Sequence, residues 1–238
     1  MKILALDSSA VVASVALFED GRLLAEYTLN NGNTHSETLL PMVESVLRTY
    51  GITADDIDLF ASTSGPGSFT GVRIGAATIK GLAFAQDKPC VGVSTLEAIA
   101  ENAKLRRGLI CPVMNARRSQ VYTALFRSDG KELVRLMPDS AMAISELDEA
   151  LAAYGEEVCF CGDGYEITLS LLQKTKATHT PERLRHQSAF SVAEVAAREY
   201  EKGNVASDST LSVNYLRPSQ AERERAERLA KENAESKA

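Results

Sequence analysis

Two stretches of the chain repeat one pattern at a fixed offset of 108 residues. Asp7 lies nine residues before Ala16, and Asn115 lies nine residues before Ala124. Each stretch has an apolar run that ends in a polar corner, a second run that ends in Ala-Leu-Phe, a glycine turn and a third run. Short apolar runs bounded by turn residues are typical of β-strands. The repeat therefore predicts an α/β fold with two similar lobes from an internal duplication, each lobe a strand meander followed by helices.

The predicted lobes divide the chain into three parts. We expect the N-terminal lobe to cover residues 1–103 and the C-terminal lobe to cover residues 104–217, with the late helices packing back on the N-terminal lobe. Residues 222–238 hold five acidic and five basic side chains, and Leu229 is their only large apolar side chain. Because such a segment has no apolar face to bury, we expect residues 218–238 to form a solvated, charged helical tail.

The overall charge disfavours some classes of partner. The net charge is −6 at pH 7, and the chain contains no Trp. An acidic protein repels phosphate backbones unless its basic residues are concentrated, and base stacking needs aromatic side chains. The short basic clusters at 104–107 and 117–118 are interpreted as solvated surface. Strong independent binding of nucleic acid is therefore not expected.

Cysteine and histidine are too few for an obvious metal site. There are four Cys and three His, and three of the Cys lie in apolar runs, as buried packing residues do. Cys159 and Cys161 share one face of a predicted strand, which leaves a metal or redox pair open as a minority interpretation. Neither a signal peptide nor an apolar run of about 18 residues is visible. A cytoplasmic protein with reduced thiols is expected.

A glycine-rich turn, Gly65-Pro66-Gly67-Ser68, stands between a predicted strand and a predicted helix. Backbone N–H groups at a helix start can bind phosphate, and the hydroxyls of Ser68 and Thr70 could add to this. No Lys follows the second glycine, as the P-loop pattern requires. As a nucleotide motif the turn is a weak signal.

The helix predicted after this turn, at 70–85, contains two glycines four residues apart, Gly71 and Gly75, followed by Ile79. Glycine inside a helix costs about 0.5–1 kcal/mol relative to alanine, so two of them need a reason. Small residues at this spacing allow a neighbour to approach closely. Two readings are open: tight packing inside the lobe, or an apolar face that docks a partner.

Several motifs together resemble one family. The stretches LALDSS, HSETLLPMVESVL and STSGPGSFTGVRIGAATIKGLA resemble the TsaB (YeaZ) family, and the late YLRP at 215–218 fits it too. The resemblance covers residues 1–126 well and is thinner through the second lobe. That family belongs to the machinery that makes N6-threonylcarbamoyladenosine at position 37 of tRNAs reading ANN codons. The resemblance implies an actin/hexokinase-like (ASKHA) fold of two similar lobes, in agreement with the repeat.

The chain departs from the family's catalytic paralogue, TsaD, at three places. TsaD carries a metal-binding His pair, an acidic pair after its first strand, and a Gly-Gly phosphate turn in its second lobe. The matching positions here hold, in that order, Thr95 and Ile99, Val11 and Val12, and Ala116 and Arg117. An Ile side chain cannot ligate a metal. The resemblance therefore implies no catalytic residue, no metal and no intrinsic cofactor, with ATP or ADP expected only at the boundary with a partner.

The resemblance also implies partners. A non-catalytic subunit of this family would pair with TsaD through the helices at 36–50 and 70–85, would support binding of the ATPase TsaE, and would contact tRNA only through the complex. Alone, it would form a homodimer through the same apolar face. The predicted partner-interface residues are His35, Leu39, Leu40, Val43, Leu47, Gly71, Val72, Gly75 and Ile79. A Gly75→Glu substitution is expected to abolish both pairings and leave the fold intact.

A second set of residues is predicted to form a vestigial phosphate loop: Asp7, Ser8, Ser9, Gly65, Gly67 and Ser68. If this loop were active, the chain would be an ATP-dependent phosphotransferase of the sugar-kinase type, with an Asp as base. A glycoprotease is a further alternative, but Ser68 has no His near it in sequence to activate it. These alternatives stand beside the non-catalytic interpretation.

Overall fold

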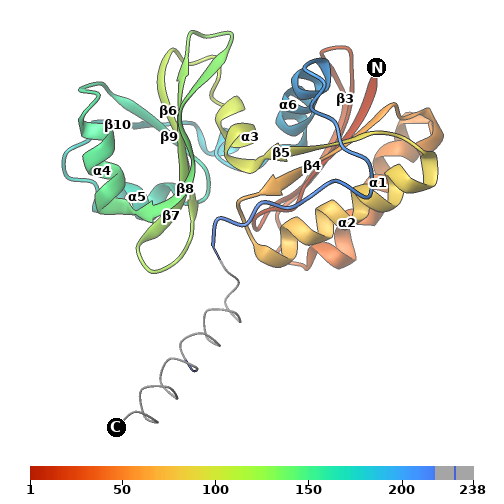
Figure 1. Cartoon of the computed structure of the whole chain (residues 1–238), viewed down its shortest axis with the longest axis horizontal. Helices are drawn as coiled ribbons and strands as arrows, with labels where there is room; N and C mark the ends of the chain where they lie inside the picture. The colour runs from red at the N-terminus through yellow and green to blue at the C-terminus, as the bar shows by residue number, and fades with distance from the viewer. Residues whose placement is uncertain (218–227, 229–238) are drawn as a thin grey trace.

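The computed structural model describes residues 1–217 and 228, and they fold into two lobes, each built on a five-stranded sheet (Figure 1). The first sheet has the order β3-β2-β1-β4-β5 and the second the order β8-β7-β6-β9-β10. The first sheet contains β1 (Lys2–Asp7), β2 (Ala13–Glu19), β3 (Arg22–Leu29), β4 (Leu59–Gly65) and β5 (Cys90–Ser94). The second contains β6 (Gly108–Asn115), β7 (Gln120–Ser128), β8 (Leu133–Ala143), β9 (Val158–Cys161) and β10 (Ala177–His179).

The two sheets share one topology. In each sheet the first three strands form an antiparallel meander. The fourth strand pairs parallel with the first strand, and the fifth pairs parallel with the fourth. β1 and β6 are the central strands, and they end at Asp7 and Asn115, the two polar corners of the repeat. The predicted duplication and the actin/hexokinase-like fold are thus confirmed.

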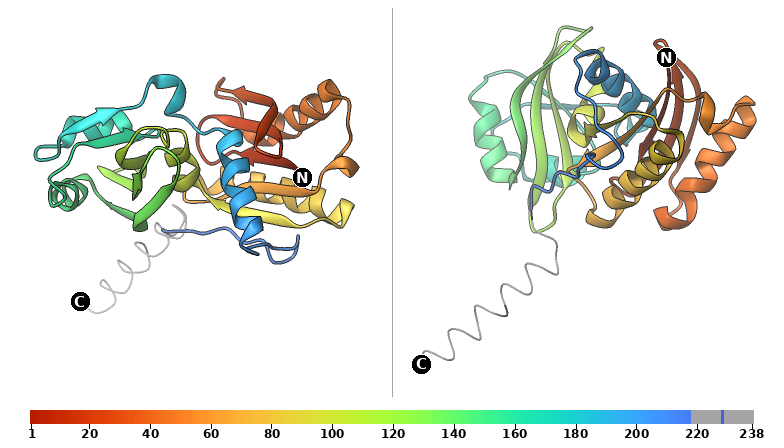
Figure 2. Two further views of the ribbon diagram at one scale, coloured as in Figure 1. Left: turned by 90° about the horizontal axis from the view of Figure 1, so that it is seen from above. Right: turned by 45° about the vertical axis from the view of Figure 1, so that its right-hand side comes forward.

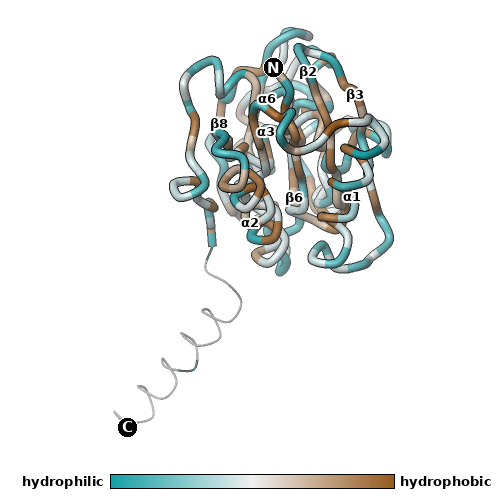
Figure 3. The backbone as a smooth tube through the Cα atoms, turned by 90° about the vertical axis from the view of Figure 1, so that its right-hand side faces the viewer, coloured by the Kyte–Doolittle hydropathy of each residue, from teal (hydrophilic) through white to brown (hydrophobic). Residues whose placement is uncertain are grey.

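Helices cover both faces of each sheet. They are α1 (His35–Tyr50), α2 (Phe69–Gln86), α3 (Thr95–Glu101), α4 (Ile144–Ala152), α5 (Tyr165–Leu171) and α6 (Ala189–Glu201), with 3-10 turns η1 (Ala54–Asp56) and η2 (Glu182–Leu184). The apolar stripe of α1 is buried on the first sheet, and the helix ends at Gly51, whose φ of +82° suits glycine. The peripheral loops are largely hydrophilic, and hydrophobic stretches lie in the elements between them (Figure 3).

Two helices pack on the lobe that their position in the chain would not suggest. Helix α6 follows the second sheet in sequence but packs on the first, where Val192 and Val195 meet Ile3 and Ala5 (Figure 1, Figure 2). Helices α1 and α2 cover the opposite face of that sheet. Helix α3, inside the predicted N-terminal lobe of residues 1–103, buries Leu96, Ile99 and Ala100 against β6 and β7, whereas its Ala98 packs in the core of the first lobe. The N-terminal sheet therefore ends at Ser94, and α3 forms the junction.

A terminal strap, residues 203–217, returns along α2 and the edge strand β5 (Figure 1). Cys90 and Ala206 exchange backbone hydrogen bonds of 2.8 Å, and the Lys80 ammonium donates to the Leu211 carbonyl at 3.0 Å. The Asn214 N–H donates to the Ser64 carbonyl at 2.7 Å. The predicted charged tail, 218–238, lies outside the described residues apart from 228. No helix among the described residues is long and apolar enough to cross a membrane.

Candidate functional site: the interlobe cleft and the outer helices

A cleft of about 650 Å³ lies between the lobes. The N-terminal lobe contributes the loop after β1 and the glycine turn before α2, and the C-terminal lobe contributes the turn after β6 and Asp163. The strap adds its last residues, Asn214 to Arg217. The loops that follow the central strands of the two repeat copies therefore meet at this cleft, together with the predicted phosphate loop.

Asp7 is the buried anchor of the β1 loop. Its Oδ1 accepts hydrogen bonds from the Ser9 N–H at 2.8 Å, the Ser9 hydroxyl at 2.6 Å and the Thr63 hydroxyl at 3.3 Å. Its Oδ2 has no hydrogen-bond partner among the described residues. Burial raises the pKa of this carboxyl to about 6, although the bonds from Ser9 and Thr63 oppose that shift. The geometry gives Asp7 a role in holding the loop in place.

The glycine turn packs on that same loop. The Ser68 N–H donates to the Ser9 carbonyl at 2.7 Å, and the Ser68 hydroxyl accepts from the Gly71 N–H at 3.2 Å as the N-cap of α2. A Cβ on Gly67 would lie 2.5 Å from the Ser9 carbonyl oxygen. The structure thus brings Asp7, Ser9, Gly67 and Ser68 together, as expected. Whether they hold a phosphate stays a prediction.

The second lobe has its own copy of the glycine turn. Gly162-Asp163-Gly164 joins β9 to α5 as Gly65-Pro66-Gly67 joins β4 to α2. Gly162 and Gly65 have φ values of +100° and +109°, which glycine alone adopts easily. The Gly164 N–H donates to the Val113 carbonyl at 3.0 Å, as Ser68 donates to Ser9. The two glycine turns are 97 residues apart, so the repeat at an offset of 108 residues does not reveal the match.

The turn between β6 and β7 has unusual backbone geometry. Arg117, Arg118 and Ser119 have φ values of +64°, +55° and +55° in succession. Ala116 is nearly buried, and its carbonyl accepts a 3.1 Å hydrogen bond from the Arg217 guanidinium. The strap is therefore tied to both lobes across the cleft.

Most of the side chains predicted to form the partner interface are buried inside their own lobe. The prediction is wrong for these residues. Leu39, Val43 and Leu47 of α1 and Ile79 of α2 have at most 9% exposure and pack in the core of their own lobe, and Val72 of α2 is also buried. They are covered because both helices turn their apolar stripe to the sheet. A free surface cannot be built from them.

The glycines of α2 also face inward. Gly71 and Gly75 lie against Ser8, whose hydroxyl donates to the Gly71 carbonyl at 2.9 Å. A Cβ at Gly75 would lie 2.6 Å from the Ser8 oxygen. Tight packing inside the lobe is thus the reason for both glycines. The expectation that Gly75→Glu leaves the fold intact is wrong, because it would bury a carboxylate against the sheet.

Other side chains of these helices are exposed. Leu40 has 48% exposure on α1, and Phe84 has 76% on α2. His35, at the start of α1, is half-buried, and its Nε2 lies 2.6 Å from the Ala10 carbonyl oxygen. His35 therefore fastens the β1 loop to α1. Docking of a partner on these two helices stays a prediction, and it would have to use the side chains that face outward.

Comparisons with known proteins identify the family. A family model for TsaD, tRNA N6-adenosine threonylcarbamoyltransferase, matches residues 22–227. The chain is 32% identical over 224 residues to the tRNA threonylcarbamoyladenosine biosynthesis protein TsaB of Bacillus subtilis, covering 93% of this chain and 96% of that protein. This chain belongs to the TsaB family.

Other similar proteins agree with this placement in the TsaB family. The Escherichia coli TsaB protein is 40% identical over 131 residues, which is 54% of this chain and 56% of that protein. A solved structure described as YeaZ from Pseudomonas aeruginosa superposes with a TM-score of 0.79 at 27% identity, covering 90% of this chain and 99% of the other. A TsaD protein from Novosphingobium aromaticivorans is 46% identical over 71 residues, 30% of this chain and 20% of that protein.

In this TsaB-family chain, the two positions that the resemblance matches to the His pair of TsaD lie in the core. Thr95 and Ile99 of α3 are fully buried, and Ile99 packs with apolar residues of the second sheet. Of the two residues at the expected acidic pair, Val12 is buried and Val11 is 63% exposed at the cleft. Among the described residues, no three His, Cys, Asp or Glu side chains are grouped to hold a metal.

The cysteines are free and buried. Burial raises the pKa of the Cys111 thiol to about 12 and that of Cys161 well above its ordinary value. A thiol in that state is a poor nucleophile and a poor metal ligand. Cys159 and Cys161 pack against α3 in the second lobe, which matches the expectation of packing residues.

Proposed function

We propose that this chain acts in the biosynthesis of threonylcarbamoyladenosine in tRNA as a non-catalytic subunit, and that it pairs with the TsaD-type transferase. The similar TsaB proteins carry this process in their names, and TsaD proteins match part of the chain. The complex would transfer the threonylcarbamoyl group on the partner, which supplies the metal site.

The observation that carries this proposal is the environment of Thr95 and Ile99. Both side chains have no exposed surface, and Ile99 belongs to the apolar core between α3 and the second sheet. In the catalytic paralogue, the resemblance puts two metal-binding His at these positions. A side chain that fills a core cannot point toward a substrate, so this turn of α3 serves packing in the present chain.

The outward side of α1 and α2 is the proposed docking face for TsaD. The two helices lie side by side on one flank of the N-terminal lobe (Figure 1). Leu40 and Phe84 expose large apolar side chains there. Exposed apolar groups on a rigid helical layer are suited to burial by a partner. In the absence of TsaD, a second copy would cover the same face, and TsaE would bind the assembled pair.

No intrinsic cofactor is proposed. Both hydrogen-bonding groups of Ser68 serve the fold, because its N–H donates to the Ser9 carbonyl and its hydroxyl caps α2. ATP or ADP would bind at the boundary with the partner. tRNA would contact the assembled complex, because an acidic chain of net charge −6 attracts a phosphate backbone poorly.

The test uses light scattering behind size exclusion, on the chain alone and mixed with TsaD from its own organism. A stoichiometric mixed species supports the proposal. A parallel assay follows threonylcarbamoyladenosine formation by nucleoside mass spectrometry, leaving out one component at a time. Product that forms at full rate without this chain would contradict a subunit role.

An ATP-dependent phosphotransferase is the second candidate, favoured by one observation. The buried carboxyl of Asp7 has a pKa of about 6, close to that of a general base, and it accepts a hydrogen bond from the hydroxyl of Ser9, which lines the cleft. Measurable ATP hydrolysis by the purified chain, lost in Asp7→Asn, would support it. An ATPase rate equal in both proteins would exclude Asp7 as its base.

A further inference from the structure

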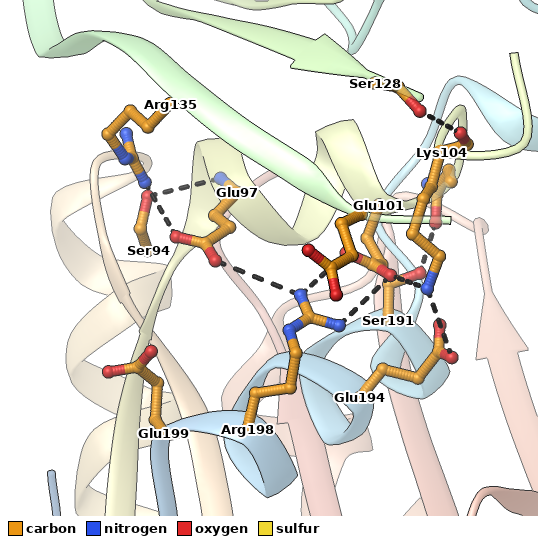
Figure 4. Close-up of polar contacts among 12 residues, drawn as sticks. Ser94, Glu97, Glu101, Lys104, Ser128, Arg135, Ser191, Glu194, Arg198 and Glu199 are labelled. Atoms are coloured by element: carbon orange, nitrogen blue, oxygen red, sulfur yellow. Dashed lines mark hydrogen bonds and ion pairs between the residues drawn. The ribbon is translucent and has the colours of Figure 1, made fainter. Parts of the chain in front are cut away.

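Helix α3 lies at the junction of the two lobes, and its polar side faces charged residues from both of them (Figure 4). Its Leu96, Ile99 and Ala100 are part of the second lobe's core, and its Ala98 packs in the first lobe's core with residues of α6. Glu97 and Glu101 stand one helical turn apart on the polar side, where α6 of the first lobe and β8 of the second approach. One short helix thus presents two carboxylates to both lobes.

The link to the first lobe runs through Arg198 of α6. Its guanidinium donates to both oxygens of the Glu101 carboxylate, at 3.2 and 2.7 Å, and lies 3.9 Å from an oxygen of Glu97. The Glu101 side chain has no exposed surface. Lys104 pairs with Glu101 as well, and its ammonium lies 3.6 Å from Glu194 of α6. A bidentate bond to a fully buried carboxylate fixes both partners in direction and distance.

The link to the second lobe runs through Arg135 of β8. Its guanidinium donates to Glu97 at 2.8 Å, pairs with Asp139, and stacks 4.5 Å above the ring of Phe126. Asp139 also accepts a 2.6 Å hydrogen bond from the hydroxyl of Ser94. Ser94 ends β5 in the first sheet and caps α3. The chain of charges therefore continues from β8 to the edge of the first sheet.

A change in the angle between the lobes would have to break this chain. Within it the Glu101 carboxylate is fully buried, and the other side chains are between 12% and 37% exposed. Separating Glu101 from Arg198 would therefore leave a buried charge without its partner. Two lobes joined without such contacts would be expected to move relative to one another. The cleft between them would then vary in width.

We propose that the α3 charge cluster, consisting of Glu97, Glu101, Lys104, Arg135, Asp139, Glu194 and Arg198, is a lock that fixes the angle between the lobes. The lock keeps the interlobe cleft at one width, so the cleft does not close on its contents. This inference is independent of the proposed function, because it concerns the chain alone.

The test measures the interlobe distance by pulsed electron spin resonance on the full chain. Spin labels go on Glu44→Cys in α1 and Glu166→Cys in α5, which are exposed, whereas the four native Cys are buried. The variants are Glu97→Gln, which removes one charge without changing shape, and Arg198→Gln. The control is Arg127→Gln, since Arg127 makes a bidentate pair with Glu156 inside the second lobe.

We expect a single narrow distance distribution for the parent and for Arg127→Gln. Both lock variants should give a distribution about twofold wider. If Arg198→Gln does not fold, Glu97→Gln carries the test, because Glu97 is partly exposed and tolerates neutralisation better. Folded variants with the parent's distribution, or a parent that is already broad, would overturn the lock.

Discussion

The hydroxyl of Ser8 donates to the carbonyl of Gly71 at 2.9 Å, and the Ser8 backbone carbonyl occupies the space that a Cβ on Gly71 would need. This contact presses α2 onto the loop after β1. It explains why a helix in the lobe's own core contains glycine. The same contact sets the position of the glycine turn at the cleft.

Gly71→Ala is therefore predicted to destabilise the fold by about 1–3 kcal/mol, as overpacking of a close contact does. Gly81 of the same helix is the matched control, because a Cβ there meets nothing within 4 Å. Gly81→Ala should stabilise by about 0.4–1 kcal/mol. Urea unfolding of both variants measures the difference. Equal effects of the two substitutions would contradict the packing account.

The raised pKa of Asp7 is expected to make the free energy of unfolding depend on pH. Its folded pKa of about 6 is above the unfolded value near 3.9, so the folded state binds the extra proton between these values. The Asp7 contribution to stability therefore falls as pH rises from about 4 to about 6, by roughly 3 kcal/mol. Asn cannot ionise and lacks this loss.

The stability of Asp7→Asn relative to the parent should thus rise by about 2–3 kcal/mol between pH 4 and pH 7. Urea unfolding at closely spaced pH values gives this difference directly. A difference that does not change with pH would show that Asp7 titrates normally.

The contacts of Tyr215 are expected to hold the strap on α2. Its hydroxyl accepts a 2.5 Å hydrogen bond from Arg73, and its ring lies 4.7 Å from that of Phe69. Tyr215→Phe removes the hydrogen bond and should weaken the strap by about 1 kcal/mol, and Tyr215→Ala by more. Hydrogen exchange of residues 211–217 should accelerate in that order. Exchange unchanged in both variants would mean that the strap is held elsewhere.

The exposed apolar side chains of α1 and α2 are expected to contact TsaD at the proposed docking face. Leu40→Arg and Phe84→Arg should each weaken pairing with TsaD at least tenfold, equal to about 1.4 kcal/mol, because a charge would replace a buried contact. Leu105→Arg is the control, since Leu105 is 85% exposed near the second lobe. Titration calorimetry against TsaD compares the three. Loss of affinity in Leu105→Arg alone would move the interface to the other lobe.

The sequence allowed the fold to be predicted more fully than the site. The offset of 108 residues identified the duplicated meander, because strand and turn residues record local geometry. It did not reveal that Gly162-Asp163-Gly164 matches the first glycine turn, since the connecting helices differ in length and Pro66 is replaced by Asp163. The exchange of α6 between lobes was predictable only in outline.

The direction in which a helix faces was the harder problem. Gly71, Gly75 and Ile79 form an apolar row that fits a partner or the helix's own sheet equally well, and Ser8 decides between them only in three dimensions. The ion pairs of α3 were also invisible in sequence, because Glu101 and Arg198 are 97 residues apart.

The most direct test of the non-catalytic subunit is the mass of this chain mixed with its own organism's TsaD, measured by light scattering with and without TsaE and ATP. We predict a homodimer that converts into a stoichiometric species containing one copy of each protein, with no ATP hydrolysis by this chain alone. A chain that forms no mixed species under any of these conditions, and that hydrolyses ATP by itself, would contradict it.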